Sequence, residues 1–342
     1  MIKNPENDPW SIIDDELQVN NRFTSEKIFS LGNGQIGQRA SFEEYFSGET
    51  ILGSHIYGSF NTDNKGLSNW EKEFSETTDE IINAPNWIGI IVRLNEEVLD
   101  LATWEVLNFE SMLNMLEGIL ERSFDAISLK GNHIHVSVKR FLSMAETEVG
   151  AISYSIKSLN FEGRISFMPI LDGEMAGQFQ NNEPIWNVLQ TRTQKDVAHL
   201  WTQTRRTDFH VCQAMTYVLY KNNEQLNILP SKIEKEKIAG FSVGTDVKRG
   251  DTISLNKYVA IVNSLNHDRK ELTETACNLA LASRQKGWNK LFEEHSAILT
   301  EMWNQSEELA EASPQSLQEN HYRLFRKFLG LDNQVLLSVP NQ

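Results

Sequence analysis

Residues 126–141 read AISLKGNHIHVSVKRF, and this stretch decides the fold class. Two runs in which apolar and polar residues alternate flank the pair Gly131–Asn132, which favours a tight two-residue turn. Alternation with a period of two places the apolar side chains on one face of a strand. The stretch therefore predicts a β-hairpin with one buried face.

The same pattern recurs from about residue 84 to residue 264. Strands joined by hairpins, without intervening helices, predict a large antiparallel β-sandwich. The further predicted hairpins are 87–94 with the strand after Asn95–Glu97, 151–157 with 164–171 across NFEG, 209–221 with 224–229 across Asn222–Asn223, and 241–248 with 252–262 across 249–251. Residues 1–83 are consistent with further strands and long loops.

The period changes to that of a helix at about residue 266. Gly287 is expected to separate two helices, and Ser313–Pro314 has the N-cap and first-turn residues that start a third. The residues predicted to form the buried helical face are Leu272, Ala276, Leu279, Ala280, Leu291, His295, Ile298 and Met302.

Composition limits the class of protein. The chain has 342 residues, of which 40% are hydrophobic and 23% charged, and a formal net charge of −15, which argues against nucleic acid or an anionic membrane as partner. The N-terminus lacks the apolar run of a secretory signal, and no segment approaches the length of a membrane helix. Cys212 and Cys277 indicate free thiols in a reducing compartment, so a cytoplasmic protein is expected.

Residues 32–37, GNGQIG, match the dinucleotide-binding pattern G-x-G-x-x-G. That pattern binds a pyrophosphate when its glycines follow a buried strand and open a helix, with an acidic residue about 20 positions later. Here the preceding segment is polar, Gly48 interrupts any following helix, and residues 51–61 contain no acid. Gly32, Gly34 and Gly37 are therefore interpreted as turn glycines or close backbone contacts, and no organic cofactor is expected.

Two groups of polar residues have the spacing of ligands. His133 and His135 share one face of a strand, but no third ligand accompanies them, so a solvent-facing sheet surface is favoured over a metal site. Arg206, Asp208 and His210 would share a face of another strand, where a cross-strand ion pair is favoured over a ligand patch.

Aromatic and acidic residues single out no site. Tryptophan faces stack on sugars, although most tryptophans of a sandwich belong to the core; the candidates are Trp70, Trp87, Trp104, Trp186 and Trp201. No spacing among the 47 acidic residues marks a general acid and a base. No catalytic residue is therefore assigned.

An ordered set of motifs resembles glycoside hydrolase family 65, which includes maltose, trehalose, kojibiose and nigerose phosphorylases. The set runs from about residue 10 to residue 305, and two of its motifs, 205–212 and 264–267, are most similar to the maltose phosphorylase branch. The motifs are SEKIFSLGNG (25–34), IGQRA (36–40), FEE (42–44), NAPNWIG (83–89), LNMLEGILERSF (113–124), KRF (139–141), EVGAI (148–152), LNF (159–161), LDG (171–173), TDFHVC (207–212) and SLNH (264–267).

The resemblance implies a galactose mutarotase-like β-super-sandwich at 1–265, linker helices at 266–310 and the start of an (α/α)6 barrel at 311–342. In the family, a barrel glutamate protonates the glycosidic oxygen while phosphate attacks the anomeric carbon and inverts it to β-glucose 1-phosphate. The implied partners are an α-linked glucose disaccharide, phosphate as co-substrate, the catalytic barrel and a second copy of the chain in a homodimer. No organic cofactor or metal is implied.

A twelve-helix barrel needs on the order of hundreds of residues, and about thirty follow the linker. We therefore expect an N-terminal half whose catalytic glutamate lies outside it, which is inactive alone and exposes an apolar patch where a barrel would dock. A stand-alone carbohydrate-binding or mutarotase-like sandwich remains an alternative, as does a scaffold for a separately encoded barrel. The disaccharide is not decided by these residues.

Overall fold

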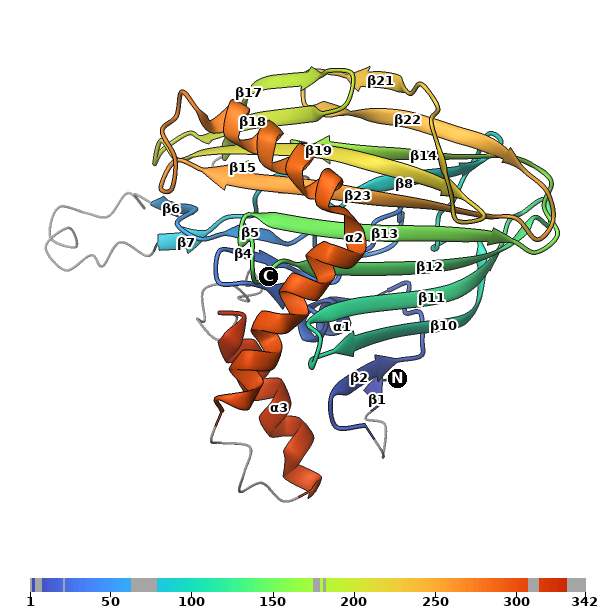
Figure 1. Cartoon of the computed structure of the whole chain (residues 1–342), viewed down its shortest axis with the longest axis horizontal. Helices are drawn as coiled ribbons and strands as arrows, with labels where there is room; N and C mark the ends of the chain where they lie inside the picture. Colours follow the sequence, from blue (N-terminus) through green and yellow to red (C-terminus); the bar gives the residue numbers. More distant parts are fainter. Residues whose placement is uncertain are drawn as a thin grey trace, which may run out of the picture.

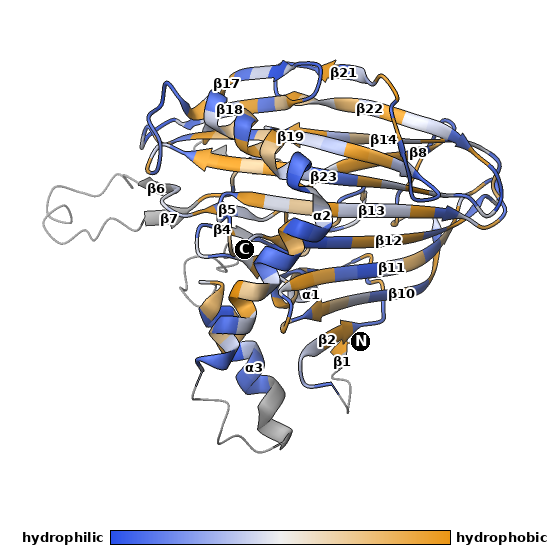
Figure 2. Ribbon diagram, in the orientation of Figure 1, coloured by the Kyte–Doolittle hydropathy of each residue, from blue (hydrophilic) through white to orange (hydrophobic). Residues whose placement is uncertain are grey.

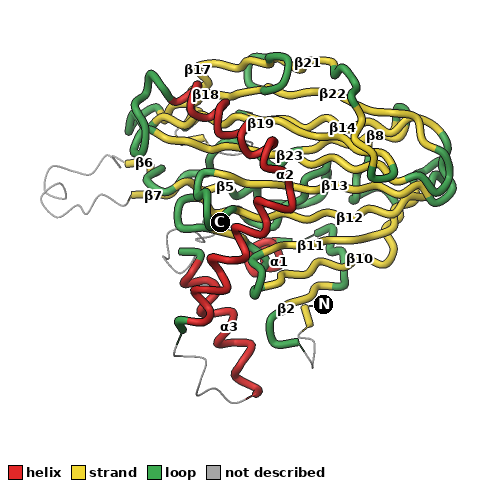
Figure 3. Tube along the Cα trace, viewed as in Figure 1, coloured by secondary structure: helices red, strands yellow, loops and turns green. Residues whose placement is uncertain are grey.

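A computed structural model of the chain describes residues 2–3, 8–20, 22–62, 79–174, 179–180, 183–306 and 314–330. The fold is mainly β, with two large antiparallel sheets and two long helices toward the C-terminal end (Figures 1 and 3). The predicted fold class is therefore confirmed. None of the described helices is both long enough and apolar enough to cross a membrane.

The larger sheet carries most of the strands predicted between residues 84 and 264. Its order is β1 (Ile2–Lys3), β2 (Ser11–Asp14), β10 (Glu105–Asn114), β11 (Ile119–Ile127), β12 (His133–Leu142), β13 (Val149–Ser158), β23 (Thr252–Asn263), β19 (His210–Lys221), β18 (Ala198–Thr204) and β17 (Trp186–Thr193), with β20 (Glu224–Leu226) on β19.

The second sheet lies against part of the larger one (Figure 1). Its order is β21 (Ser231–Glu234), β22 (Ile238–Val247), β14 (Gly163–Asp172), β8 (Ile90–Leu94) and β9 (Glu97–Val98). Smaller antiparallel groups are β3 (Leu31–Gly32), β4 (Ile36–Gln38) and β5 (Ser54–Ile56); β6 (Phe60–Thr62) and β7 (Asp79–Ile81); and β15 (Phe179–Gln180) and β16 (Glu183–Pro184).

Strand β23 shows why part of the sequence is continuously apolar. Leu255 and Val259 belong to the core between the sheets, whereas Tyr258 and Ala260 face α2 (Leu272–Asn304), which crosses the outer face of the larger sheet. A strand covered on both faces loses the alternation of a half-exposed strand. Figure 2 shows apolar residues along these central strands and a mixed pattern on α2.

One charged side chain of β23 lies inside the sandwich. Lys257 is fully buried, and its Nζ donates hydrogen bonds to the carbonyl oxygens of Trp87 (2.6 Å), Gly89 (3.0 Å) and Ile170 (2.8 Å). Burial lowers the pKa of Lys257 well below its ordinary value. Three carbonyl oxygens match the three N–H donors of an ammonium, so Lys257 joins β23 to the second sheet.

Helix α2 confirms the predicted break at Gly287, which has φ 77° and ψ 167° inside the helix. The prediction of the buried face is correct for the residues as far as His295, namely Leu272, Ala276, Ala280, Leu291 and His295. Leu279 is partly buried and packs against the cluster that contains Leu272, Ala276 and Ala280. It is wrong at Ile298, which is 37% exposed, because the face continues through Leu299 and Trp303 instead. After the kink, buried residues recur every four positions.

Two predicted hairpins are wrong. β13 pairs with β12 and β23 in the larger sheet, whereas β14 pairs with β8 and β22 in the second sheet. β22 and β23 also lie in different sheets. The turn residues at 160–163 and 249–251 reverse the chain in either arrangement, so local turn chemistry does not distinguish a hairpin from a crossing between sheets.

The other predicted hairpins are confirmed as β8–β9, β11–β12 and β19–β20. Asn222 and Asn223, in the turn between β19 and β20, have the positive φ angles that such turns require. The β11–β12 connection is longer than predicted, because the last pair is Ile127 with His133 and Gly131 lies at φ 80° within a five-residue loop, 128–132.

Helix α3 (Pro314–Phe328) packs against the N-terminal part of the chain. The ring of His321 stacks on Trp10 with 3.7 Å between centroids, and His321 Nδ1 lies 3.0 Å from the carbonyl oxygen of Pro9. The Tyr322 hydroxyl donates to the carbonyl oxygen of Ile28. The last strand ends at Asn263 and α2 begins at Leu272, while the proposed domain boundaries at 265/266 and 310/311 remain predictions.

Candidate functional site

The glycines of the G-x-G-x-x-G match lie in a β-hairpin. Gly32 is in β3, Gly37 is in β4, and Gly34 has φ 82° in the turn between them. The Asn33 side chain accepts hydrogen bonds from the N–H groups of Gln35 and Ile36 and donates to two distant carbonyl oxygens. Because no helix follows these glycines, the geometry of a dinucleotide loop is not formed, and the turn interpretation is confirmed.

His133 and His135 lie on the outward-facing positions of β12, as expected for a sheet surface. His135 Nδ1 is 2.8 Å from Asp125 Oδ1 on the neighbouring strand β11. Nowhere in the described ranges do three His, Cys, Asp or Glu side chains converge as metal ligands. His135 thus takes part in a cross-strand contact.

The group Arg206, Asp208 and His210 does not lie on one strand. β18 ends at Thr204 and β19 begins at His210, so the intervening residues form a turn in which Asp208 has φ 54°. The predicted cross-strand geometry is wrong, although Asp208 does form an ion pair: Arg269 Nη1 lies 2.7 Å from Asp208 Oδ2, and His210 Nε2 lies 3.2 Å from Oδ1. A turn aspartate, which tolerates the left-handed conformation, explains the error.

The described tryptophans favour the core interpretation. Trp87, Trp104 and Trp186 are buried in the main hydrophobic cluster, and Trp201 packs at the edge of a second one. Trp70 lies outside the described residues. Both cysteines are free thiols, as predicted, with Cys212 buried and Cys277 half-buried.

Three of the quoted motifs meet in a buried ion cluster, formed by Glu43, Glu44, Arg122 and Arg140. Arg140 Nη1 donates to Glu43 Oε1 at 2.6 Å, and Arg122 Nη2 donates to Glu43 Oε2 and Glu44 Oε2, each at 2.7 Å. Burial alone would raise the pKa of Glu43, but the two guanidinium groups hold it below its ordinary value. The adjoining cavity holds about 10 Å³, which is room for one water at most.

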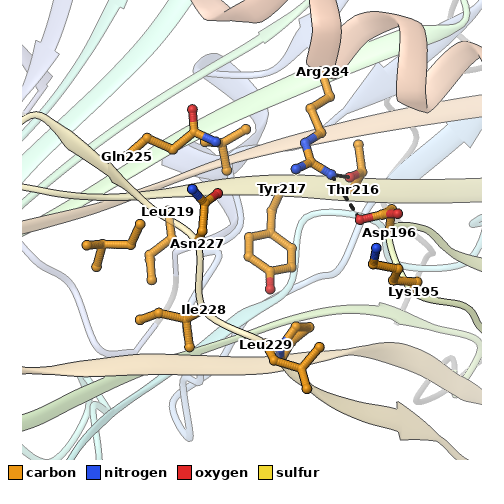
Figure 4. A pocket seen from close by; sticks show the side chains of 13 residues that line it. Lys195, Asp196, Thr216, Tyr217, Leu219, Gln225, Asn227, Ile228, Leu229 and Arg284 are labelled. Atoms are coloured by element: carbon orange, nitrogen blue, oxygen red, sulfur yellow. Dashed lines mark hydrogen bonds and ion pairs between the residues drawn. The ribbon is translucent and has the colours of Figure 1, made fainter.

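A larger cavity, of about 370 Å³, opens beside β19 (Figure 4). Four parts of the chain build it: the β17–β18 turn, strand β19, strand β20 with the loop that follows, and helix α2. The lining residues are Lys195, Asp196, Thr216, Tyr217, Val218, Leu219, Gln225, Leu226, Asn227, Ile228, Leu229, Pro230 and Arg284.

An interruption of the larger sheet creates this cavity. β18 pairs with β19 as far as Met215, and β20 pairs with it from Leu219. On the edge of β19 that pairs with β18 and β20, residues 216–218 therefore have neither strand beside them. Successive residues of an antiparallel strand direct their N–H and C=O groups to opposite edges, so at least one of the three presents both groups to the cavity.

Polar side chains enter the cavity from both sides of β19. Arg284 reaches from α2, with Nη1 at 3.4 Å from the Thr216 hydroxyl and 3.7 Å from Asp196 Oδ1 (Figure 4). Tyr217 projects from the other face of the strand, with its ring 5.3 Å from that of Phe241. Burial raises the pKa of Tyr217 to about 12, so its hydroxyl stays protonated and can donate a hydrogen bond.

None of these residues stands out in the sequence as a site candidate. They come from positions up to 89 residues apart (Lys195 to Arg284), and no spacing relates them. The available signals were the Asn222–Asn223 turn, which starts the short strand β20, and Pro230, which is compatible with its early end.

The two packed antiparallel sheets, followed by long helices, define the class: a β-super-sandwich domain with a helical extension. The model for "Glycosyl hydrolase family 65, N-terminal domain" matches residues 12–302. The chain belongs to this family, as its sequence resemblance indicated.

Curated relatives agree with the match. The chain is 28% identical over 332 residues to maltose phosphorylase of Bacillus subtilis (strain 168), covering 96% of this chain and 43% of that protein. It is 24% identical over 347 residues to alpha,alpha-trehalose phosphorylase of Thermoanaerobacter brockii, covering 96% and 44%. The chain thus spans less than half the length of these relatives.

A solved structure supports the fold. A putative kojibiose phosphorylase from human microbiome superimposes with a TM-score of 0.81 over 96% of this chain and 42% of that chain. The two sequences are 19% identical.

Proposed function

We propose that this chain is the non-catalytic N-terminal part of an inverting α-glucosyl disaccharide phosphorylase of the maltose phosphorylase type. In the full enzyme, the reaction converts a disaccharide and phosphate into β-glucose 1-phosphate and glucose. The observation that carries the proposal is the family match over residues 12–302, which ends with the sandwich and α2. The reaction would then take place in a part of the enzyme outside these residues.

The electrostatics of the described carboxylates support a non-catalytic role. A glycosidic general acid needs a raised pKa, and burial with nearby negative charge is the usual means of raising it. Glu43 is buried, yet its arginine partners lower its pKa. Burial does raise the pKa of Asp172, but its Oδ1 accepts the backbone N–H of Glu174 at 2.7 Å and thus holds the end of β14.

We extend the proposal to the partners of the full enzyme: an α-linked glucose disaccharide, phosphate, a catalytic barrel and a second copy of the chain, in the cytoplasm. The two free thiols support a reducing compartment. An apolar contact for another domain is available at Tyr57 and Leu265, which are 63% and 60% exposed, with Leu265 lying over neighbouring Gly58. That docking patch remains a prediction.

Turnover by the purified chain tests the non-catalytic role. Incubation with maltose and phosphate, followed by an enzyme-coupled assay for β-glucose 1-phosphate, is expected to yield no product above background. Maltose phosphorylase of Bacillus subtilis is the positive control under the same conditions. Product formed in proportion to this chain's concentration would contradict the proposal.

The coding sequence beyond codon 342 tests the relation to a phosphorylase. Sequence for a helical barrel, in any of the three frames, is the expected result. Unrelated sequence would favour the stand-alone sandwich instead.

A further inference from the structure

We propose that the cavity between β18, β19, β20 and α2 is a binding site for a neutral saccharide, with one hexose unit as the group recognised. Its volume of about 370 Å³ lies within the roughly 300–1,000 Å³ of small-molecule sites. The choice of a saccharide among neutral ligands rests on the proposed function. The cavity plays no part in the proposed phosphorolysis.

The polar groups of the cavity match those of a sugar. The guanidinium of Arg284 donates, the hydroxyls of Thr216 and Tyr217 both donate and accept, and the amides of Gln225 and Asn227 supply each kind of group. A sugar ring carries hydroxyls that each donate and accept. The open edge of β19 at residues 216–218 adds a backbone donor and acceptor beside them.

These groups are available to a ligand. The contacts of Arg284 with Thr216 and Asp196, at 3.4 Å and 3.7 Å, are long, so its guanidinium keeps donors for a further acceptor. The Tyr217 hydroxyl has no hydrogen-bond partner among the described residues. Gln225 and Asn227 are exposed at the rim.

The charge of the lining favours a neutral ligand over phosphate. Asp196 pairs with Arg284 and offsets its charge, which leaves exposed Lys195 as the remaining ionised group of the lining. An anion placed against Arg284 would also meet the carboxylate of Asp196. A hydroxyl avoids this repulsion because it can donate to the carboxylate and accept from the guanidinium.

An apolar wall completes the site. Tyr217 extends toward the segment that carries Ile228 and Leu229 (Figure 4), and these residues line the cavity together with Pro230. Leu229 is 85% exposed, so its side chain is accessible to a ligand at the mouth of the cavity. Aromatic and aliphatic surfaces of this kind contact the C–H face of a pyranose ring.

Binding of glucose and of maltose to the intact chain tests the site, measured by saturation-transfer NMR titration at neutral pH. We expect saturable binding. Arg284→Met, which removes the central donor, should weaken it by about tenfold, corresponding to about 1.4 kcal/mol. Asn227→Trp should abolish it by filling the cavity, without removing a buried hydrogen bond. Arg249→Ala, an equal change of charge in the exposed β22–β23 turn, should leave affinity within about twofold.

Three outcomes would overturn the proposal: no saturable binding of either sugar, binding that both cavity variants leave unchanged, or displacement of the sugar by inorganic phosphate at the same site. Thermal melting of each variant checks that it is folded. If Arg284→Met is unstable, Asn227→Trp still tests the site, because residue 227 is exposed. Absence of binding contradicts this site alone, whereas turnover of maltose contradicts the proposed function alone.

Discussion

The Nη1 atom of Arg140 donates a hydrogen bond of 2.6 Å to Oε1 of Glu43, and both side chains are at least 95% buried. Glu43 belongs to an irregular segment near the N-terminus, and Arg140 belongs to β12, 97 residues later. Because the second oxygen of Glu43 binds Arg122 of β11, one carboxylate joins an outlying segment to two central strands. The FEE, LERSF and KRF motifs therefore act as one structural unit.

Replacing Glu43 with glutamine should lower the free energy of unfolding by about 3–5 kcal/mol, because it leaves two buried guanidinium groups with less negative charge. The matched control is Glu121→Gln, which breaks the partly exposed pair of Glu121 and Lys139 and should cost less than about 1 kcal/mol. Urea denaturation followed by circular dichroism measures both. Equal decreases in the free energy of unfolding of the two variants would show that the buried cluster stabilises the fold no more than an exposed ion pair does.

His295 should make stability depend on pH. Its Nδ1 accepts the backbone N–H of Met144 (3.1 Å), its Nε2 donates to the carbonyl oxygen of Glu117 (2.8 Å), and burial lowers its pKa to about 4. The unfolded side chain titrates near pH 6.5, so the unfolded state binds more protons as pH falls below that value. The contribution of neutral His295 to the free energy of unfolding is therefore fully present above about pH 6.5. It decreases as the pH falls toward 4, by about 3 kcal/mol at most.

Denaturation of the wild type and His295→Gln between pH 4 and 7.5 isolates this contribution, since the other titrating groups are common to both. The stability difference is expected to shrink as pH falls. A difference that stays constant across the range would refute the assignment of a neutral, buried His295.

Two glycines with positive φ provide a matched pair for packing. A Cβ atom at Gly118 (φ +64°) would lie 2.4 Å from Leu299 Cδ1 and 2.9 Å from His295 Nε2, whereas one at Gly131 (φ +80°) would meet nothing within 4 Å. Gly131→Ala should cost about 1–2 kcal/mol of backbone strain, and Gly118→Ala about 1–3 kcal/mol more because of overpacking against α2. Thermal and urea unfolding check the order, and a larger loss at Gly131 would contradict it.

The two thiols should react slowly in the folded protein. Burial raises the pKa of Cys212 to about 12 and that of Cys277 to about 11, so little thiolate is present near pH 8. Reaction with a chromogenic disulfide reagent should be at least about 100-fold slower in the native than in the denatured protein. Cys212→Ser and Cys277→Ser separate the two rates, and rapid native labelling of either thiol would contradict the burial.

Sequence patterns predicted where the strands lie better than they predicted which strands pair with one another. The strand pairing at residues 126–141 and the turn at Asn222–Asn223 were right because alternation and turn chemistry act over a few residues, although the loop of the first hairpin is longer than predicted. The connections after β13 and β22 were wrong because the strand that follows each joins the other sheet. Which sheet a strand joins depends on distant partners: Val149 of β13 pairs with Ala260 of β23, 111 residues later.

The same limit applies to the sites. The motifs named Glu43, Arg122 and Arg140, but only the fold showed that their charges compensate one another in the interior. Lys257, within the strand TISLNKYVAIV, carried no sign that its ammonium would bind three carbonyl oxygens of other segments. The cavity was not predicted, because it exists where β18 ends and β20 begins along a shared neighbour.

By itself, the sequence determined the β-sandwich class, the change to helix near residue 266, the break at Gly287 and the family to which the chain belongs. The tertiary structure decided which strands pair, which charges are buried together and where the larger sheet is interrupted. The physical reason is one of range. Periodicity and turn preferences are local properties of the backbone, whereas burial, ion pairing and cavities depend on atoms that only the folded chain brings within a few ångströms of one another.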